Sequence, residues 1–137
     1  MPAHTIGIDV GSQSIKGCLL DPDGEVVAVG RRGTTMRHPA SGWAEQDPAE
    51  WRQGIAAVVR EVLQRADVAG DEVGQLGLAC QVDGVVPVDA ELEPLRDGVI
   101  WLDRRAESEA AALAQRVGER QLFELTGLNC NASHTAP

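Results

Sequence analysis

The first third of the chain alternates short apolar runs with small polar turns. Residues 6–20 hold an apolar run that ends in Asp9, a tight turn of small residues and a second apolar run. Residues 21–24 then turn the chain back into residues 25–30. Runs of this length, joined by turns this short, are typical of an antiparallel meander. We therefore expect three consecutive strands, with a polar tip between the first two.

The middle of the chain has a helical period. Asp47 and Pro48 are typical of a helix start. The apolar positions that would bury one helical face are Trp51, Ile55, Val58, Val59, Val62, Leu63 and Ala66. We expect a helix over Pro48–Ala66, preceded by a loop over residues 34–47. Trp43 either anchors this loop to the rest of the protein or lines a pocket, and anchoring is favoured because tryptophan is usually buried.

The second half of the chain predicts alternating strands and helices. Residues 75–81 form a short apolar run after a helix, which predicts a buried strand reached by a parallel crossover. Further strands are predicted at residues 85–88 and 99–102, and further helices at residues 104–117 and 118–125, before a polar tail over residues 126–137. This order looks like the opening part of an α/β domain.

Composition places the chain among acidic globular proteins. Its 137 residues are 43% hydrophobic, and 12 Lys and Arg stand against 21 Asp and Glu, a net charge of −9. This balance argues against a nucleic-acid or anionic-membrane surface. Because no apolar run has the length of a membrane span and the N-terminus lacks a signal-like segment, we expect a cytoplasmic protein. Cys18, Cys80 and Cys130 fit neither a disulfide framework nor a zinc site, and the first two are expected in the core.

The tip between the first two strands has the chemistry of a phosphate site. Gly11 would let a ligand approach the backbone, where successive amides can converge on one anion. Side chains that could add donors are those of Ser12, Ser14 and Lys16. Asp9 would fit if a Mg²⁺ lay between it and the phosphate, held through water. The residues alone leave open the alternative that this turn only shapes a hairpin.

Five segments, taken in chain order, resemble the N-terminal domain of the FGGY carbohydrate kinases, which include xylulokinase, glycerol kinase, gluconate kinase and ribulokinase. The segments are residues 6–12 with Lys16, residues 42–48 with Trp51, residues 81–84, residues 100–105, and Thr126-Gly127. The first would suit any actin-like ATPase, whereas Glu45-Gln46-Asp47-Pro48 and Trp101-Leu102-Asp103-Arg104 are specific to the family. Xylulokinase-like members look most similar.

The resemblance implies an α/β fold, a partial ribonuclease-H-like (actin-like ATPase) domain in which a β-meander precedes alternating helices and strands. Residues 1–137 would be the N-terminal part of domain I, without the rest of that domain or the nucleotide-binding domain II. It implies ATP- and Mg²⁺-dependent phosphorylation of a sugar or polyol, such as a pentulose, and it is compatible with a homodimer. Because the family's general base lies beyond Pro137, no catalytic residue is expected here and the chain alone should be inactive.

The resemblance also assigns site residues. It places Asp9, Gly11, Ser12, Gln13, Ser14 and Lys16 at the ATP phosphates, with Asp9 near Mg²⁺ through water. It places Gln81, Val82, Asp83, Trp101, Asp103 and Arg104 around the sugar. Each sugar-side residue has a structural alternative: Asp103 could cap the second helix, Arg104 could form a surface ion pair and Trp101 could be core. For Asp83 we favour substrate contact, because a carboxylate at a strand end before glycine has little structural purpose.

One departure from the family concerns the substrate. Xylulokinases usually carry Met-His and glycerol kinases Arg-Glu where this chain has Val82-Asp83. An anion at this position makes an acidic sugar a poor fit. The first alternative function is a non-catalytic half-domain or regulator that binds sugar or phosphate. The second is another actin-like ATPase of the chaperone type, which the segments at Trp43 and Trp101 disfavour because such proteins hold no sugar.

Overall fold

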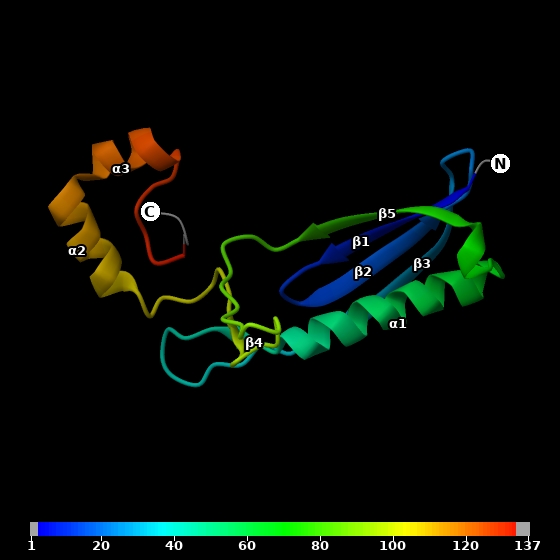
Figure 1. The fold of residues 1–137 in the computed structure, drawn as a ribbon, viewed down its shortest axis with the longest axis horizontal. Coiled ribbons are helices and arrows are strands. Elements are labelled where there is room, and N and C mark those ends of the chain that lie inside the picture. The colour runs from blue at the N-terminus through cyan, green and yellow to red at the C-terminus, as the bar shows by residue number, and fades with distance from the viewer. Residues whose placement is uncertain (1–2, 134–137) are drawn as a thin grey trace. The chain divides into compact units, whose positions relative to one another are not determined.

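The computed structural model describes residues 3–133, and the chain forms two compact units (Figure 1). Unit 1 comprises Met1–Thr35 and Ala49–Gln81, and unit 2 comprises Met36–Pro48 and Val82–Pro137. Residues 134–137, the end of the expected polar tail, lie outside the described range. Among the described residues, no helix is both long and apolar enough to cross a membrane.

Unit 1 is built on a sheet of strand order β3-β2-β1-β5. β1 (His4–Val10), β2 (Ser14–Leu20) and β3 (Val26–Gly33) pair antiparallel, while β5 (Val73–Cys80) pairs parallel with β1. The predicted meander and the predicted parallel crossover are both confirmed. The fold class is α/β, as expected.

Helix α1 (Pro48–Ala66) begins and ends at the predicted residues and covers one face of this sheet. The core consists of alternate strand residues and one helical stripe: Ile6, Ile8, Val10, Ile15, Leu19, Ala28, Val58 and Val62. α1 lies very close to β2, because a Cβ on Gly17 would come within 2.5 Å of Val58 and one on Gly54 within 2.4 Å of Ile15. Each buried aliphatic side chain stabilises this contact by roughly 1.5–3 kcal/mol.

Strand β5 contradicts the prediction of a buried strand. Leu76 and Leu78 pair with Ile6 and Ile8, which places them on the core face of the sheet, yet they are 55% and 59% exposed. Cys80, expected in the core, is also exposed. A short 3-10 turn, η1 (Gly70–Glu72), precedes the strand. Within the described residues α1 leaves these side chains uncovered and no strand pairs with the outer edge of β5, so the strand lacks the neighbours that would bury it.

Unit 2 contains a small ladder and two helices. β4 (Glu45–Gln46) pairs antiparallel with β6 (Gly98–Val99), and Val85 forms a bridge to Val99 on the other side. The helices are α2 (Glu107–Val117) and α3 (Glu119–Thr126). The expected loop before α1 therefore includes a strand, because Glu45 finds its partner about fifty residues later in the chain.

Several predicted boundaries in unit 2 were wrong. The strand expected over residues 85–88 is reduced to bridges at its two ends, and the strand expected over residues 99–102 ends at Val99. The helix expected from residue 104 begins only at Glu107, with Ala106 at its N-cap. The reason is a long-range contact: Asp103 and Arg105 interact with each other and with Ala44 and Glu45 instead of entering a helix.

Candidate functional site

The turn between β1 and β2 is closed by its own backbone and fastened at its outer side. The Gly11 N–H donates to the Ser14 carbonyl at 3.1 Å, and a Cβ on Gly11 would lie 3.2 Å from that oxygen. Thr34 holds the turn through two bonds, from its hydroxyl to the Ser12 carbonyl at 2.9 Å and from its N–H to the Gln13 carbonyl at 3.1 Å. These contacts occupy carbonyl oxygens that would otherwise repel an approaching anion.

Asp9 and Lys16 face each other across β1 and β2, with 3.7 Å between the Lys16 ammonium and the Asp9 carboxylate. Arg31 is the next residue in the same row, opposite Lys16 on β3. All three side chains are exposed, while the neighbours of Asp9 along β1 are buried. An exposed pair of this kind adds about 0–1 kcal/mol to stability. The row is therefore a local positive patch around one carboxylate, in a chain whose net charge is −9.

Ser14 differs from its expected role at the tip. It is only 3% exposed, so its hydroxyl is not presented to solvent as a donor. Gln13 is exposed and Ser12 is half-buried, so these two residues and Gly11 form the accessible part of the turn. The structure thus brings together five of the six residues predicted for the phosphates, and it buries the sixth.

In unit 2, a second turn carries Trp101. The Ile100 N–H donates to the Ala44 carbonyl at 3.1 Å, and the Arg104 N–H donates to the Gly42 carbonyl at 2.7 Å. Between these anchor points the Asp103 N–H donates to the Ile100 carbonyl at 2.9 Å, which closes the turn. Trp101 lies at its tip and is 40% exposed, so the alternative that it is a core residue is wrong.

Asp103 lies beneath this turn and is only 3% exposed. Its carboxylate accepts hydrogen bonds from the Ala44 N–H at 2.7 Å and from the Arg105 N–H at 2.9 Å. The Arg105 guanidinium adds a two-pronged contact, at 2.9 Å from Nε and 2.8 Å from Nη2. Burial raises the pKa of Asp103, but these hydrogen bonds and the Arg105 charge outweigh burial and hold the pKa below its ordinary value. Asp103 does not cap α2, so that alternative is also wrong.

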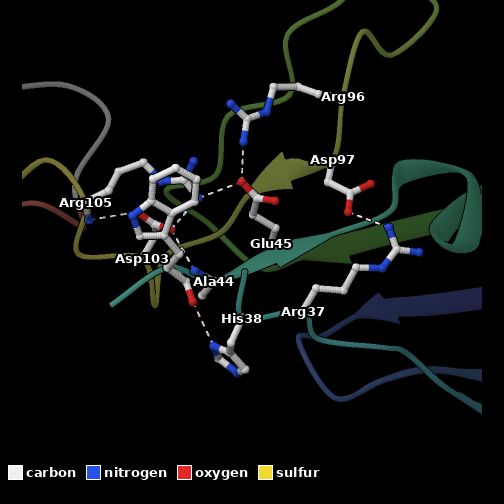
Figure 2. Close-up of polar contacts among 9 residues, drawn as sticks. Arg37, His38, Ala44, Glu45, Arg96, Asp97, Asp103 and Arg105 are labelled. Carbon is white, nitrogen blue, oxygen red and sulfur yellow. Dashed lines mark hydrogen bonds and ion pairs between the residues drawn. The ribbon is translucent and has the colours of Figure 1, made fainter. Parts of the chain in front are cut away.

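Arg105 connects Asp103 to the segment around Trp43 (Figure 2). Its Nη2 also donates to the Glu45 carboxylate at 2.7 Å, and its guanidinium stacks over the Trp43 ring at 3.8 Å. The hydrogen bond to Asp103 raises the pKa of Arg105. Burial lowers that pKa by a smaller amount, so it stays above its ordinary value. Trp43 thus helps to anchor its own loop, in agreement with the favoured prediction.

The sequence did not identify this network of ions. Glu45 is buried and also accepts a hydrogen bond from Arg96, and Arg37 contacts Asp97 at 2.5 Å (Figure 2). Arg37 also lies 3.8 Å from the Asp47 carboxylate. Glu45 and Arg105 both belong to segments that the sequence singles out, but their pairing spans 60 residues. The only signal in the sequence was that one segment contains a carboxylate, Glu45, and the other a guanidinium, Arg105.

Asp83 has a left-handed backbone and a carboxylate that no described residue contacts through a hydrogen bond or an ion pair. Its φ is +58°, a left-handed conformation that costs a residue with a Cβ about 1–2 kcal/mol. Its side chain is half-buried, and none of the described residues donates a hydrogen bond or forms an ion pair with it. The segment is held by two hydrogen bonds between Val85 and Val99, at 2.8 and 2.9 Å. A carboxylate without a partner among the described residues keeps its acceptor capacity available to a ligand.

The remaining sugar-side residues have simpler surroundings. The Gln81 N–H donates to the Val10 carbonyl at 2.9 Å and extends the ladder of unit 1 by one bond, whereas Val82 is exposed. Arg104 is exposed, and its guanidinium contacts the Trp101 carbonyl at 3.5 Å and the hydroxyl of Ser133. Within the described residues Arg104 forms no ion pair with a carboxylate, so the surface-pair alternative finds no support there.

A model of the N-terminal domain of the FGGY family of carbohydrate kinases matches residues 4–137. A glycerol kinase of Methylorubrum extorquens is 34% identical over 129 residues, which are 93% of this chain and 26% of that protein. A xylulose kinase of Escherichia coli is 33% identical over 132 residues, 96% of this chain and 26% of that protein.

Solved structures show the same relation. A xylulose kinase from Rhodospirillum rubrum is 31% identical with a TM-score of 0.81, covering 88% of this chain and 25% of that one. A kinase from Brucella ovis described as a xyloylose kinase is 26% identical with a TM-score of 0.88, covering 96% and 27%. The chain therefore spans about a quarter of the length of the relatives it matches.

Proposed function

Because this chain belongs to the FGGY family of carbohydrate kinases, we propose that it forms the N-terminal part of an enzyme that transfers the γ-phosphoryl group of ATP to a hydroxyl of a sugar or polyol. The observation that carries the proposal is Asp83, a half-buried residue whose carboxylate has no partner among the described residues and which follows the end of β5 in the chain. In open α/β sheets, ligands bind beyond the carboxyl ends of the strands.

For the phosphate side, we propose that Ser12 and Gln13 receive phosphate oxygens on their amides, that Gly11, which has no Cβ, lets the phosphate come close to the turn, and that Lys16 supplies a positive charge. Asp9 suits a Mg²⁺ held through water, because its carboxylate is 52% exposed and only loosely paired. When bound, Mg²⁺ would neutralise charge that develops on the phosphates. We leave Ser14 out of this set because it is buried.

For the sugar side, we propose that Asp83 accepts hydrogen bonds from hydroxyls, that Trp101 offers its ring to the C–H face of the polyol and that Arg104 donates. Gln81 and Val82, which precede Asp83 in the chain, complete the set that the family resemblance assigns to the sugar. Asp103 supports this group from beneath, because its carboxylate already accepts hydrogen bonds from Ala44 and Arg105. A buried carboxylate with these partners has little capacity left for a hydroxyl.

The finer proposal is a neutral substrate, with a pentulose such as xylulose as the first candidate. An anion at position 83 would repel the carboxylate of an acidic sugar. Glycerol is the second candidate, since glycerol kinases match this chain as well as xylulose kinases do. ATP and Mg²⁺ as co-substrate and cofactor, and a cytoplasmic location, belong to the same proposal.

We also propose that residues 1–137 are completed by further protein that supplies the general base and the nucleotide-binding domain. The edges of the sheet support this. On β3, the Arg65 side chain donates to the Val29 carbonyl and Arg32 pairs with Glu61, so that edge is charged and partly capped. β5 contains neither the charged residues nor the proline that protect edge strands, and it exposes Leu76 and Leu78. These features are typical of a strand in the interior of a sheet, so we propose that further protein covers it.

The test is an assay of ADP release by the complete protein that carries these residues, with xylulose, ribulose, glycerol and gluconate as substrates. We expect Mg²⁺-dependent turnover with a pentulose or glycerol and little with gluconate, and no turnover by the 137-residue chain alone. Binding of a polyol without ADP release would favour the non-catalytic alternative. ATP hydrolysis that is indifferent to every sugar would refute the proposal.

A further inference from the structure

Arg105 joins groups from two segments that lie far apart in the sequence. Its guanidinium contacts the Asp103 carboxylate, the Glu45 carboxylate and the Trp43 ring at once. The Glu45 and Asp103 side chains are 8% and 4% exposed, and that of Arg105 is 20% exposed. These contacts therefore lie largely away from water, where their geometry is well defined.

Two backbone connections lead from this cluster to exposed residues. Asp103 closes the turn that carries Trp101, through its N–H bond to the Ile100 carbonyl. Glu45 pairs with Val99 in the ladder of β4 and β6, and Val99 in turn pairs with Val85, two residues beyond Asp83. The cluster thus fixes both the turn and the strand that flanks Asp83.

We propose that Arg105 is a positioning residue, which sets the location of Trp101 and Asp83 relative to each other by clamping Asp103 to Glu45 and Trp43. The proposal rests on the proposed sugar kinase function, because it concerns how the sugar side of that site is held. Arg105 itself does not touch the substrate.

The chemistry of the clamp requires a guanidinium. Only its planar fork can meet both Asp103 oxygens while it also reaches Glu45 and lies flat on the Trp43 ring. A lysine would keep the charge but could satisfy one of these directions at a time. Buried ion clusters are often no more stabilising than apolar packing, so we expect this cluster to contribute mainly by fixing the geometry around it.

The first experiment compares Arg105→Lys with the wild type in the complete protein, by steady-state kinetics with each substrate varied in turn. Because small misplacements of contact groups are costly, we expect the KM for the sugar to rise roughly 10- to 100-fold. The KM for ATP should stay within about twofold, because this substitution does not touch the phosphate turn. Arg120→Lys is the matched control, since Arg120 also pairs with a carboxylate, Glu124, but is fully at the surface.

The second experiment is a double-mutant cycle with Trp101→Leu. If Arg105 acts through the position of Trp101, Arg105→Lys will cost far less in kcat/KM when Trp101 is already leucine. A merely structural loss would be additive in this cycle. Glu45→Gln provides a second variant of near-identical shape, and a smaller rise in the sugar KM is expected from it.

The inference is overturned if the wild type phosphorylates a sugar while Arg105→Lys and Glu45→Gln leave its KM unchanged, or if the cycle is additive. If Arg105→Lys does not fold, as judged by circular dichroism, Glu45→Gln takes its place in the cycle with Trp101→Leu. Non-additive effects of Glu45→Gln and Trp101→Leu then support the inference, and additive effects overturn it. A wild-type protein that shows no sugar-dependent ADP release rejects the proposed function itself, a separate outcome that is visible before any variant is made.

Discussion

Replacing Asp103 with alanine should destabilise unit 2 strongly, because this buried carboxylate is the acceptor for the buried Ala44 N–H and for the half-buried Arg105 guanidinium. The Ala44 N–H would lose its partner at 2.7 Å, and Arg105 would lose a two-pronged contact while it keeps Glu45. Breaking a buried ion pair by removing one partner costs about 3–5 kcal/mol. Because Arg105 keeps its contact to Glu45, we expect the free energy of unfolding to fall by the lower end of this range, about 3 kcal/mol.

The measurement is urea unfolding of the 137-residue chain, followed by tryptophan fluorescence, since two of its three tryptophans, Trp43 and Trp101, lie in unit 2 and the third, Trp51, lies in unit 1. Asp103→Asn is the matched control: it keeps the shape and one carbonyl acceptor, and it should cost less than alanine. Destabilisation of less than about 1 kcal/mol by Asp103→Ala, typical of an exposed ion pair, would refute our account of this carboxylate.

The same pair of proteins tests the sign of a pH dependence. The pKa of Asp103 is lower in the folded chain than its ordinary value, which is about 3.9 in an unfolded chain. The carboxylate therefore contributes its full stabilisation above that ordinary value, and the contribution is lost as the pH falls through the lower, native pKa. The stability difference between wild type and Asp103→Ala should be constant near neutral pH and shrink in acid. A difference that grows in acid would contradict this sign.

Three further predictions concern the exposed groups. Gly11→Val, which places a Cβ 3.2 Å from the Ser14 carbonyl, should lower kcat/KM for ATP roughly tenfold in the complete protein, whereas Gly33→Ala, where the new Cβ meets nothing within 4 Å, should not. Asp83→Asn keeps a residue that tolerates the left-handed backbone but removes a charged acceptor, so kcat/KM for the sugar should fall roughly 10-fold or more, while Asp67→Asn at the other left-handed aspartate should leave it unchanged. Because β5 is an exposed apolar edge strand, we expect the 137-residue chain to self-associate as its concentration rises, and Leu78→Lys to suppress this association in size-exclusion chromatography. An elution profile that Leu78→Lys leaves unchanged would argue against association through β5.

Local patterns predicted local structure well. α1 was predicted to the residue because its start signal, Asp47-Pro48, lies directly before its apolar stripe in the sequence. The meander followed from short turns between apolar runs, and the direction of β5 followed from the crossover rule. Each of these depends on neighbours in the sequence, where periodicity and turn chemistry are visible.

The failures concern partners that the sequence does not place. An apolar run such as Leu76 to Leu78 predicts burial, but whether it is buried depends on what lies against it. The start of α2 was misjudged because Asp103 and Arg105 are engaged with Ala44 and Glu45, about sixty residues earlier. No window of local sequence contains both halves of that interaction.

Two of the segments that carry the family resemblance, residues 42–48 and 100–105, contact each other through their side chains. Glu45 and Trp43 from the first meet Asp103 and Arg105 from the second, and the carboxylates among them are buried. Their side chains therefore explain the shape of the sugar side of the proposed site better than its choice of sugar. That choice must depend on exposed groups, and the clearest of them, Asp83, stands where the chain departs from both xylulokinases and glycerol kinases. Replacing Val82-Asp83 with Met-His should therefore change which sugars are phosphorylated while leaving the clamp at Arg105 intact, a shift that the ADP-release panel would detect.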